Sequence, residues 1–385
     1  MDQTVFDEKA SHLWHIHGQT YDLSTFVDVH PGGRLAILSA RGRDGTALFE
    51  SYHVWTDRHR RVLASFGPEP PPPDPFYEEL KAGVRQAFPL GSVQTKMRST
   101  TFCVLCLCWC VMMYLFFFVR TSPACVVAGL LMAVAGTRLA HEGAHWQISR
   151  HAWVNRLALF LGFFPVGPSM IWHYRHVISH HAHTNQDDDV DVEYVWFVDM
   201  LPRWLKLLMI PWLAPGAVVE IGPKGLFDMF VVRAVCGHHV DLSLGGLLFE
   251  TPIWFFVHAV FGPSLWSYFC MYAAAGAIFM PCSQVAHAIL FPDPRDHPSW
   301  ARLQIAESAD FATDSKFWYH LAVGLTTQVE HHLFPGLGNH CSEEIRHIVR
   351  AVCHRHGVQY IDISARKAFG ALWHRWMSGN PIPLT

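Results

Sequence analysis

Charged residues are scarce in this sequence, and positive charge is not in excess. Charged residues make up 16% of the 385 residues, well below the roughly 25% of an average soluble protein. Lys and Arg number 29 against 32 Asp and Glu, which gives a net charge of -3 at pH 7. Without a basic excess to neutralise phosphates, nucleic acid is not expected as a partner. Hydrophobic residues reach 51%, and this composition predicts a chain that lies at least partly in a membrane.

Three further patterns are missing. Residues 1–14 hold no basic segment followed by an apolar one, so we expect no secretory signal. No Gly-x-Gly-x-x-Gly fingerprint follows a predicted strand, so a nicotinamide cofactor would act through a separate protein. The ten cysteines show no disulfide framework, which is typical of a reducing, cytosol-facing protein. Four of them share one uncharged run, where we expect them to be small buried hydrophobic residues: Cys103, Cys106, Cys108 and Cys110.

Uncharged stretches long enough to cross a bilayer occur in two parts of the chain. Thr101 to Val119 is 19 residues without a charge, close to the ~20 that a membrane helix needs, and a second apolar segment begins at Ala124. Thr251 to Ala286 is also uncharged but is interrupted by Gly262-Pro263, which indicates two more spans joined by a tight turn. The sequence thus predicts an all-α membrane domain with four spans, at about 101–119, 124–140, 247–262 and 265–286, and interfacial helices at 153–171 and 203–219.

The N-terminal segment differs in composition from this membrane domain. Residues 1–66 carry mixed charges and short apolar runs, and residues 67–75 read GPEPPPPDP. A proline-rich run resists helix and strand and behaves as a semi-rigid spacer. We therefore predict a small domain at 1–66, a linker at 67–75 and a membrane domain at 76–385, with residues 76–95 as an amphipathic helix leading to the membrane.

Two histidines of the N-terminal segment indicate a haem site. His30 is followed by Pro-Gly-Gly, a sharp turn with little bulk, where a flat macrocycle can approach the imidazole, and His53 follows Asp-Gly-Thr-Ala-Leu-Phe. Two imidazoles from opposite walls of an apolar pocket leave a haem iron no open position, so it carries electrons. These motifs resemble the cytochrome b5 family over roughly residues 8–66. The resemblance implies a small α+β domain that binds haem b, with His30 and His53 as axial ligands.

Histidine is abundant, with 27 residues, and many gather in three motifs of the membrane domain. The spacing of His141 and His145, and of His176 and His180, puts each pair on one helix face, with His181 about 100° further round. If spans pair as two hairpins, all motifs return to the same, cytosolic side as a histidine-rich cap. Imidazole suits iron, zinc and copper, but eight nitrogen ligands exceed the four or so that zinc takes, so two iron ions fit better. The eight histidines are His141, His145, His176, His180, His181, His287, His331 and His332.

This pattern resembles the membrane fatty-acyl desaturases, which carry HxxxH, HxxxHH and a third motif that ends in HH. Gln328, in place of a leading His in QVEHHLFP, resembles the front-end desaturases, as does the fused cytochrome b5 domain. The resemblance implies that the eight histidines hold two non-haem iron ions, with Gln328 in or beside the ligand set, and that Gln328, His331 and His332 are catalytic. Glu142 departs from the family's Asp, and the spacing of the second motif leaves His173 and His183 as further candidates. An acidic run after that motif, Asp187 to Glu193, is either a hard-cation site, a set of hydrogen-bond partners for ligand imidazoles, or a solvated loop.

The resemblance implies a front-end desaturase that inserts a cis double bond between an existing double bond and the carboxyl end of a polyunsaturated acyl chain. It implies O2 as oxidant, electrons relayed through the fused haem, and NADH-cytochrome b5 reductase as donor. The substrate is an acyl-lipid or acyl-CoA in a membrane, with the endoplasmic reticulum as the expected location and the cytosol as the side of both centres. Candidate residues for lining an acyl tunnel are Trp254, Phe255, Phe256, Trp266, Ala273, Ala274, Ala275 and Gly276.

Three other functions compete with this one. A sphingolipid long-chain-base desaturase shares the haem domain and the Gln-led motif. A haem-fused fatty-acid hydroxylase is disfavoured, because those enzymes resemble a motif with His at the position of Gln328. A membrane-anchored haem electron carrier with an inactive metal region would hold haem iron only. The sequence leaves the position of the double bond open, because one sequence supplies no tunnel depth.

Overall fold

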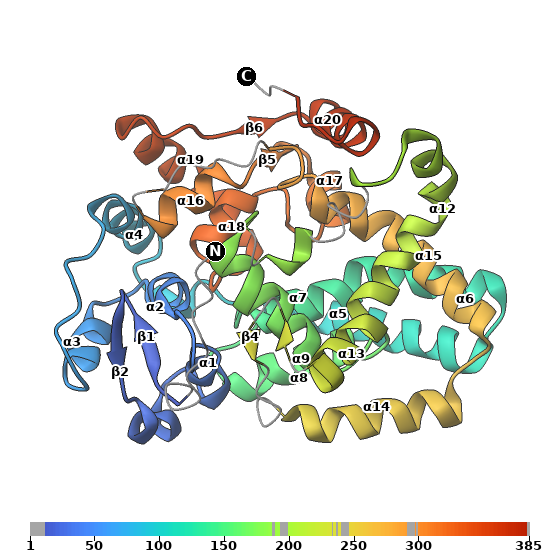
Figure 1. Ribbon diagram of the computed structural model, residues 1–385, viewed down its shortest axis with the longest axis horizontal. Helices are drawn as coiled ribbons and strands as arrows, with labels where there is room; N and C mark the ends of the chain where they lie inside the picture. The colour runs from blue at the N-terminus through green and yellow to red at the C-terminus, as the bar shows by residue number, and fades with distance from the viewer. Residues whose placement is uncertain are drawn as a thin grey trace.

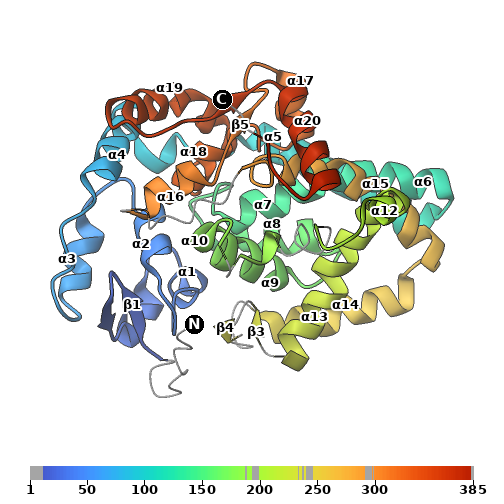
Figure 2. The ribbon, with the colours of Figure 1, turned by 45° about the horizontal axis from the view of Figure 1, so that its top comes forward.

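The computed structural model describes residues 12–186, 189–192, 199–232, 234–235, 238–239, 246–290, 297 and 299–382. A small N-terminal domain lies against a larger domain that is almost entirely helical (Figures 1 and 2). This arrangement confirms the expected fold class, an α+β unit attached to a helical domain with apolar helices of membrane-spanning length.

The N-terminal domain is a two-stranded antiparallel sheet with three short helices. Its core is apolar, and the Trp14 indole inside it donates a hydrogen bond to the Ile37 carbonyl at 2.7 Å. Trp14 and Ile16 alternate with half-buried His15 along β1, which is the two-residue period of a strand with one buried face. The elements are β1 (Trp14–Ile16), β2 (Gln19–Tyr21), the 3-10 helix η1 (Ser24–Val29), α1 (Arg34–Leu38), α2 (Thr46–Tyr52) and α3 (Arg58–Ala64).

The proline-rich segment contains neither helix nor strand up to Asp74, and α4 (Pro75–Ala87) begins directly after it. The Asp74 carboxylate accepts a hydrogen bond from the Phe76 N–H, and Pro75 occupies the first helical turn, where its missing N–H costs nothing. The helix ends at Ala87, earlier than the predicted 95, because Phe88 precedes a proline. Its apolar face packs against α19 (Asn339–Arg355), so α4 joins the C-terminal cap instead of leading straight to the membrane.

A buried ionic cluster fastens the N-terminal domain to α4. The Lys81 ammonium has no exposed surface and donates to Glu50 Oε2 at 2.9 Å, and Arg60 and His17 also bond to the same carboxylate. Burial alone would raise the pKa of Glu50, but the hydrogen bonds from His17 and Lys81 and the charges of Lys81 and Arg60 lower it to about 2. The carboxylate is therefore charged at neutral pH and, together with Glu78 at 3.0 Å from the Lys81 ammonium, compensates the charge of this buried lysine.

Three helices of the described residues are long and apolar enough to cross a membrane: Ser99–Val119, Ser122–Ala144 and Leu265–Gln284. A helix also forms at the third predicted span, but α14 (Leu247–Phe261) has 15 residues and is about 22 Å long, less than the ~30 Å of a hydrocarbon core. It diverges from α15 (Leu265–Gln284) after the connecting turn (Figures 1 and 2). The predicted number of four spans therefore stays a prediction.

The outer faces of these helices are apolar and exposed, as a membrane requires. On α5 (Ser99–Tyr114) and the π-helix η3 (Leu115–Val119), an exposed stripe recurs at helical spacing. Cys103 and Cys110 are also exposed on α5, so the expectation that they are buried is wrong, and all nine cysteines of the described residues are free. The stripe comprises Val104, Leu107, Val111, Tyr114 and Phe118.

The remaining helices build the core of the membrane domain and the cap above it. Helix α8 (Ala152–Phe163) packs against α7 (Thr137–Ala144), and α12 (Arg203–Val219) packs along α15. Helices α8 and α12 form at the two segments predicted to be interfacial, although α8 ends eight residues before the predicted end at residue 171. The cap consists of α4 and the C-terminal elements from α16 to α20, and it lies on one side of the domain (Figure 1). The elements are η2 (Gly91–Val93), α6 (Ser122–Leu131), η4 (Met132–Gly136), α7 (Thr137–Ala144), α8 (Ala152–Phe163), α9 (Ser169–Trp172), η5 (His173–His180), α10 (His181–His183), η6 (Val190–Val192), α12 (Arg203–Val219), η7 (Glu220–Lys224), α13 (Gly225–Phe227), η8 (Asp228–Val232), β3 (Ala234–Val235), β4 (His238–His239), α16 (Trp300–Ala306), β5 (Asp310–Phe311), α17 (Lys316–Leu321), α18 (Gln328–Leu333), β6 (Asp362–Ile363) and α20 (Ala365–Ser378).

Candidate haem and metal sites

His30 and His53 face one another across a cavity of about 660 Å³. Their ring centroids are 6.2 Å apart. A metal ion between the two imidazoles would form two bonds to nitrogen of about 2.0 Å each. These two bonds and the distance from each nitrogen to the centre of its ring add up to a separation of this size. Burial lowers the pKa of both imidazoles to about 4, so both are neutral at pH 7 and offer a lone pair. The pair therefore fits a bis-histidine haem.

Local structure sets the orientation of both imidazoles. His53 Nδ1 bonds to the Phe49 carbonyl at 2.7 Å, which leaves Nε2 for the cavity. Beside His30, a Cβ at Gly32 would lie 3.0 Å from the imidazole Cε1, and Gly33 has a φ of +84°. Both glycines of the Pro-Gly-Gly turn are thus required, one for space and one for conformation. His59, which sequence reasoning did not single out, stacks on His53 at 4.7 Å.

The haem cavity is shared between the two domains. Trp146, Val177 and Gly336 of the membrane domain line it together with residues of the N-terminal domain. Lys96 and Arg150 also line it and offer positive charge suited to the two propionate carboxylates of a haem. A haem held by His30 and His53 would therefore lie at the junction of the domains, against the wall that carries the histidine motifs.

The structure brings all eight predicted histidines of the membrane domain together in its interior. Seven of them form two clusters, in each of which ligand atoms lie within 4.8 Å of one another. His181 lies between the clusters, with its ring centroid 4.4 Å from that of His145 and 4.2 Å from that of His332. The first cluster consists of His141, His145, His176 and His331, and the second consists of His180, His287 and His332.

Helical geometry sorts the histidines between the clusters. His141 and His145 lie one turn apart at the end of α7, as the spacing predicts. His176 and His180 of the second motif lie on the π-helix η5, not on the expected α-helix, and His181 begins the short α10; the wider turn of a π-helix is typical of functional sites. On α18 the adjacent His331 and His332 point to different clusters. These two neighbouring histidines therefore lie in different clusters.

Gln328 belongs with the second cluster. Its side-chain nitrogen lies 3.0 Å from His287 Nε2 and 3.1 Å from His332 Nε2. It shares a face of α18 with His332, four residues on. An amide in this position contacts the same imidazole nitrogens that would face a metal ion, so the placement agrees with the prediction that Gln328 lies in or beside the ligand set.

Many of the clustered imidazole nitrogens are buried without a hydrogen-bond partner. An unpaired buried polar atom typically costs about 1–3 kcal/mol, and metal coordination removes that cost. Burial also lowers the pKa of His145, His181, His331 and His332 well below the usual value, so these imidazoles are neutral and able to coordinate. The unpaired atoms are both ring nitrogens of His141, His181 and His331, and Nε2 of His145 and His176. This donor set fits metal ions.

Two carboxylates from the acidic run orient cluster histidines. Asp189 bonds to His180 Nδ1 at 2.8 Å, and Asp191 bonds to His176 Nδ1 at 3.1 Å. Burial alone would lower the pKa of His180, but Asp189 raises it above the usual value. These hydrogen bonds agree with the second of the predicted roles, and Asp191 also lies with His176 and His180 in a third group of possible metal ligands. Asp187, Asp188 and Glu193 lie outside the described residues.

Further partners of the clusters were not foreseen. Gln304 Oε1 bonds to His332 Nδ1 at 2.6 Å, and the Glu307 carbonyl bonds to His287 Nδ1 at 2.7 Å. Both residues come from α16 and its C-terminal end, a segment whose sequence has no motif. Tyr52 Oη of the N-terminal domain lies 2.8 Å from His145 Nδ1. No sequence pattern indicates these contacts, because they depend on how distant segments pack.

The sequence left the roles of Glu142, His173 and His183 open, and all three lie outside the two histidine clusters. Glu142 is buried and pairs with Arg138, and it also accepts from Asn339 at 3.3 Å. His173 Nε2 bonds to Ser39 of the N-terminal domain at 2.8 Å. His183 is half-buried at the end of α10. None of the three belongs to a metal-ligating group among the described residues.

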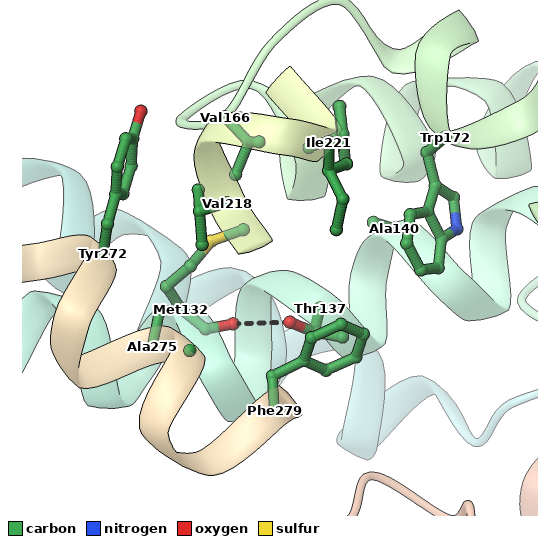
Figure 3. A pocket seen from close by; sticks show the side chains of 12 residues that line it. Met132, Thr137, Ala140, Val166, Trp172, Val218, Ile221, Tyr272, Ala275 and Phe279 are labelled. Carbon is green, nitrogen blue, oxygen red and sulfur yellow. Dashed lines mark hydrogen bonds between the residues drawn. The ribbon is translucent and has the colours of Figure 1, made fainter. Parts of the chain in front are cut away.

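An apolar cavity adjoins the histidine clusters. A cavity of about 70 Å³ touches His141, His176 and Gln328, and it shares several wall residues with a second, apolar cavity of about 50 Å³. Figure 3 shows this second cavity, where the Thr137 hydroxyl donates to the Met132 carbonyl in the π-helix η4. Of the candidate tunnel residues, Ala275 and Gly276 line it. Phe255, Phe256 and Trp266 are exposed on the outer surface. The shared wall residues are Thr137, Trp172, Val218, Ile221, Gly276 and Phe279.

Comparison with known proteins identifies the family. The family model of the fatty acid desaturases matches residues 120–364, which include all three histidine motifs. The chain belongs to the fatty acid desaturase family. A second family model, the cytochrome b5-like haem/steroid-binding domain, matches residues 4–81. The protein is thus an oxygen-dependent fatty acyl desaturase, not a haem carrier with an inactive membrane region, and its two parts imply haem and iron as cofactors.

Curated relatives of this desaturase cover nearly its whole length. An acyl-lipid omega-13 desaturase of Chlamydomonas reinhardtii is 28% identical over 94% of this chain and 91% of its own. An acyl-lipid (8-3)-desaturase B of Dictyostelium discoideum is 26% identical over 92% of this chain and 89% of its own. A Delta(5) fatty acid desaturase A of the same organism is 26% identical over 90% of this chain and 85% of its own.

Proposed function

We propose that this desaturase is a front-end enzyme that acts on polyunsaturated acyl chains of membrane lipids, with two iron ions held by the eight clustered histidines. One observation carries the proposal: histidines of both buried clusters line a cavity that shares wall residues with an adjacent apolar cavity. The (8-3)- and Delta(5)-desaturases among the relatives, together with Gln328 at the head of the third motif, support the front-end position of the new double bond.

The first cluster would hold one iron ion and the second cluster the other, with His181 between them and Gln328 beside the second. Iron bound there supplies the O2-derived oxidising power that unactivated methylene groups require, since no side-chain base can remove such hydrogens. Overall, two hydrogens of the acyl chain, two electrons and two protons reduce one O2 to two waters, and a cis double bond forms.

Residues of the chain itself orient the clustered histidines and keep water away from them. The carboxylates of Asp189 and Asp191 hold His180 and His176 in one orientation and favour a proton on each Nδ1, so that Nε2 is free for the metal. Gln304 does the same for His332. Burial of all eight histidines keeps bulk water from the oxidising centre. The apolar cavity beside them then holds a methylene pair of the acyl chain.

The fused haem domain would deliver the two electrons one at a time. Docking of that domain against the membrane domain raises the effective concentration of donor at acceptor far above that of a free partner. NADH-cytochrome b5 reductase is the proposed source of the electrons. Lys96 and Arg98 precede the first membrane helix, which favours a cytosolic side for both centres under the positive-inside rule, and we propose the endoplasmic reticulum as the location.

Expression in a host without polyunsaturated lipids, fed a panel of fatty acids, tests this function. Mass spectrometry locates each new double bond and shows whether it lies in the lipid-bound or CoA-bound pool. We expect a cis double bond on the carboxyl side of an existing one, formed in the lipid-bound pool. A double bond on the methyl side, in a sphingoid base, or a hydroxylated product would contradict the proposal.

Ala275→Phe is expected to close the apolar cavity, because Ala275 is one of its wall residues (Figure 3). A phenyl group adds far more volume than a cavity of about 50 Å³ can accept without displacing neighbours. Product from long acyl chains should fall at least tenfold, with ~1.4 kcal/mol of lost binding corresponding to each factor of ten. The measurement is product yield against chain length, with haem absorbance as the folding check.

Ala277→Phe is the matched control, because Ala277 is exposed on the same helix. It adds the same side chain two residues away but faces outward. Equal losses of product in both variants would show that bulk on α15 disturbs the fold, and that the cavity is not the acyl site.

A further inference from the structure

Among the described residues, the side chain of Tyr52 connects the N-terminal domain to a clustered histidine by a hydrogen bond. Tyr52 is the last residue of α2 and directly precedes His53, the proposed haem ligand. Its Oη lies 2.8 Å from His145 Nδ1 across the domain boundary. Ser39 also crosses this boundary to a histidine, but its partner, His173, belongs to neither cluster.

His145 connects this contact to the first cluster. Its Nε2 is buried without a partner and lies among the cluster's ligand atoms, while its Nδ1 is taken by Tyr52. A metal-bound histidine commonly uses its second nitrogen in this way, to bond to an outer partner. One imidazole therefore joins the proposed metal site to Tyr52.

The ring of Tyr52 is held from two sides by the membrane domain. The Trp146 ring meets it edge-on with centroids 5.7 Å apart. A Cβ at Gly336 would lie 3.3 Å from Tyr52 Cδ1, so the turn after the third motif approaches the ring closely. Tyr52, Trp146 and Gly336 all line the cavity between His30 and His53. Tyr52 thus borders the haem cavity on one side and contacts a cluster histidine on the other.

We propose that Tyr52 is the electron-transfer contact between the haem and the metal centre, an inference that rests on the proposed function. The path runs along the chain from His53 to Tyr52 and crosses to His145 through one hydrogen bond. Each passage oxidises the haem iron by one electron and reduces the metal centre by one, and two passages serve one turnover. Tyr52 is neither oxidised nor deprotonated in the net reaction. Its role is to fix the contact, so it is a positioning residue.

Tyr52→Phe tests the inference, because phenylalanine keeps the ring between Trp146 and Gly336 and removes only the hydroxyl. The full-length enzyme is reduced, mixed with O2 and acyl substrate, and haem reoxidation is followed by stopped-flow absorbance. We expect reoxidation to slow at least about tenfold, the loss typical of removing an outer partner of a metal-bound histidine. The haem spectrum and non-haem iron content should stay unchanged, and a chemical reductant that bypasses the haem should restore single-turnover product.

Ser39→Ala is the matched control, because it removes a second hydrogen bond from the N-terminal domain to a membrane-domain histidine, one that belongs to neither cluster. It should reoxidise haem at the wild-type rate. A wild-type rate in Tyr52→Phe, an equal slowing in Ser39→Ala, or loss of non-haem iron from Tyr52→Phe would each overturn the inference while wild-type activity persists. Wild-type enzyme that neither forms product nor reoxidises its haem with substrate would overturn the proposed function itself, and this inference with it.

Discussion

Replacing His331 by alanine is expected to abolish the desaturated product while the reduced-haem spectrum stays intact. His331 lies in the first cluster, with its ring centroid 4.5 Å from that of His141 and 4.8 Å from that of His145. Both of its ring nitrogens are buried and have no hydrogen-bond partner among the described residues, so the alanine variant removes one nitrogen ligand from the first cluster. Product should fall below detection by mass spectrometry, and non-haem iron should fall with it.

His347→Ala is the control for this experiment, since His347 is exposed on α19 and belongs to neither cluster. It should leave product and iron content unchanged. The haem cavity lies between His30 and His53, residues of a different domain from His331. Loss of the haem band from His331→Ala would therefore contradict a model with two separate centres.

His30→Ala should have the reverse effect, with loss of the haem band and retention of non-haem iron. His30 provides one wall of the 660 Å³ cavity, and its removal leaves His53 as the remaining imidazole of the facing pair. Without an electron carrier, NADH-driven turnover should stop, because each double bond requires two electrons from outside the active site. The absorbance spectrum and the product yield with NADH and reductase are the measurements.

His15→Ala serves as the control, because His15 bonds to Thr20 within the sheet and does not line the haem cavity. It should keep both the haem band and turnover. Unchanged turnover in His30→Ala would show that the tethered haem is dispensable and that electrons reach the metal centre by another route.

The sequence predicted which histidines come together, because their spacing is a local property of helices. The pair His141–His145 needed only the period of an α-helix, and the arrangement of spans implied that the motifs share one side. His176 and His180 lie on a π-helix and fall in different clusters. The structure places these residues in two adjoining clusters. Their roles as iron ligands, and those of His30 and His53 as haem ligands, remain predictions that the variants above test.

The partners of those histidines could not be predicted, because they come from segments without a repeating pattern. Gln304 and Glu307 reach His332 and His287 from a helix that no motif marks. Tyr52 reaches His145 only because the N-terminal domain docks, whereas the proline-rich run predicted a semi-rigid spacer and gave no docked position. The buried Lys81–Glu50 pair joins the N-terminal domain to α4. Its two members are 31 residues apart in the chain, and no sequence pattern connects them.

Some of the backbone geometry also could not be predicted from the sequence. The second motif was expected on an α-helix and lies on a π-helix, since the same residue types suit both and only the surrounding packing decides. The apolar segment at 247–262 forms a helix with nearly the predicted bounds, α14 (Leu247–Phe261), and its crossing of a membrane stays a prediction.

Metal stoichiometry tests the two-centre account most directly. Purified full-length enzyme is analysed for total iron by mass spectrometry and for haem by absorbance, on the same sample. The account predicts three irons per chain, one in haem held by His30 and His53 and two at the clustered histidines. A ratio of one iron per haem in active enzyme, or another metal at the clusters, would contradict it.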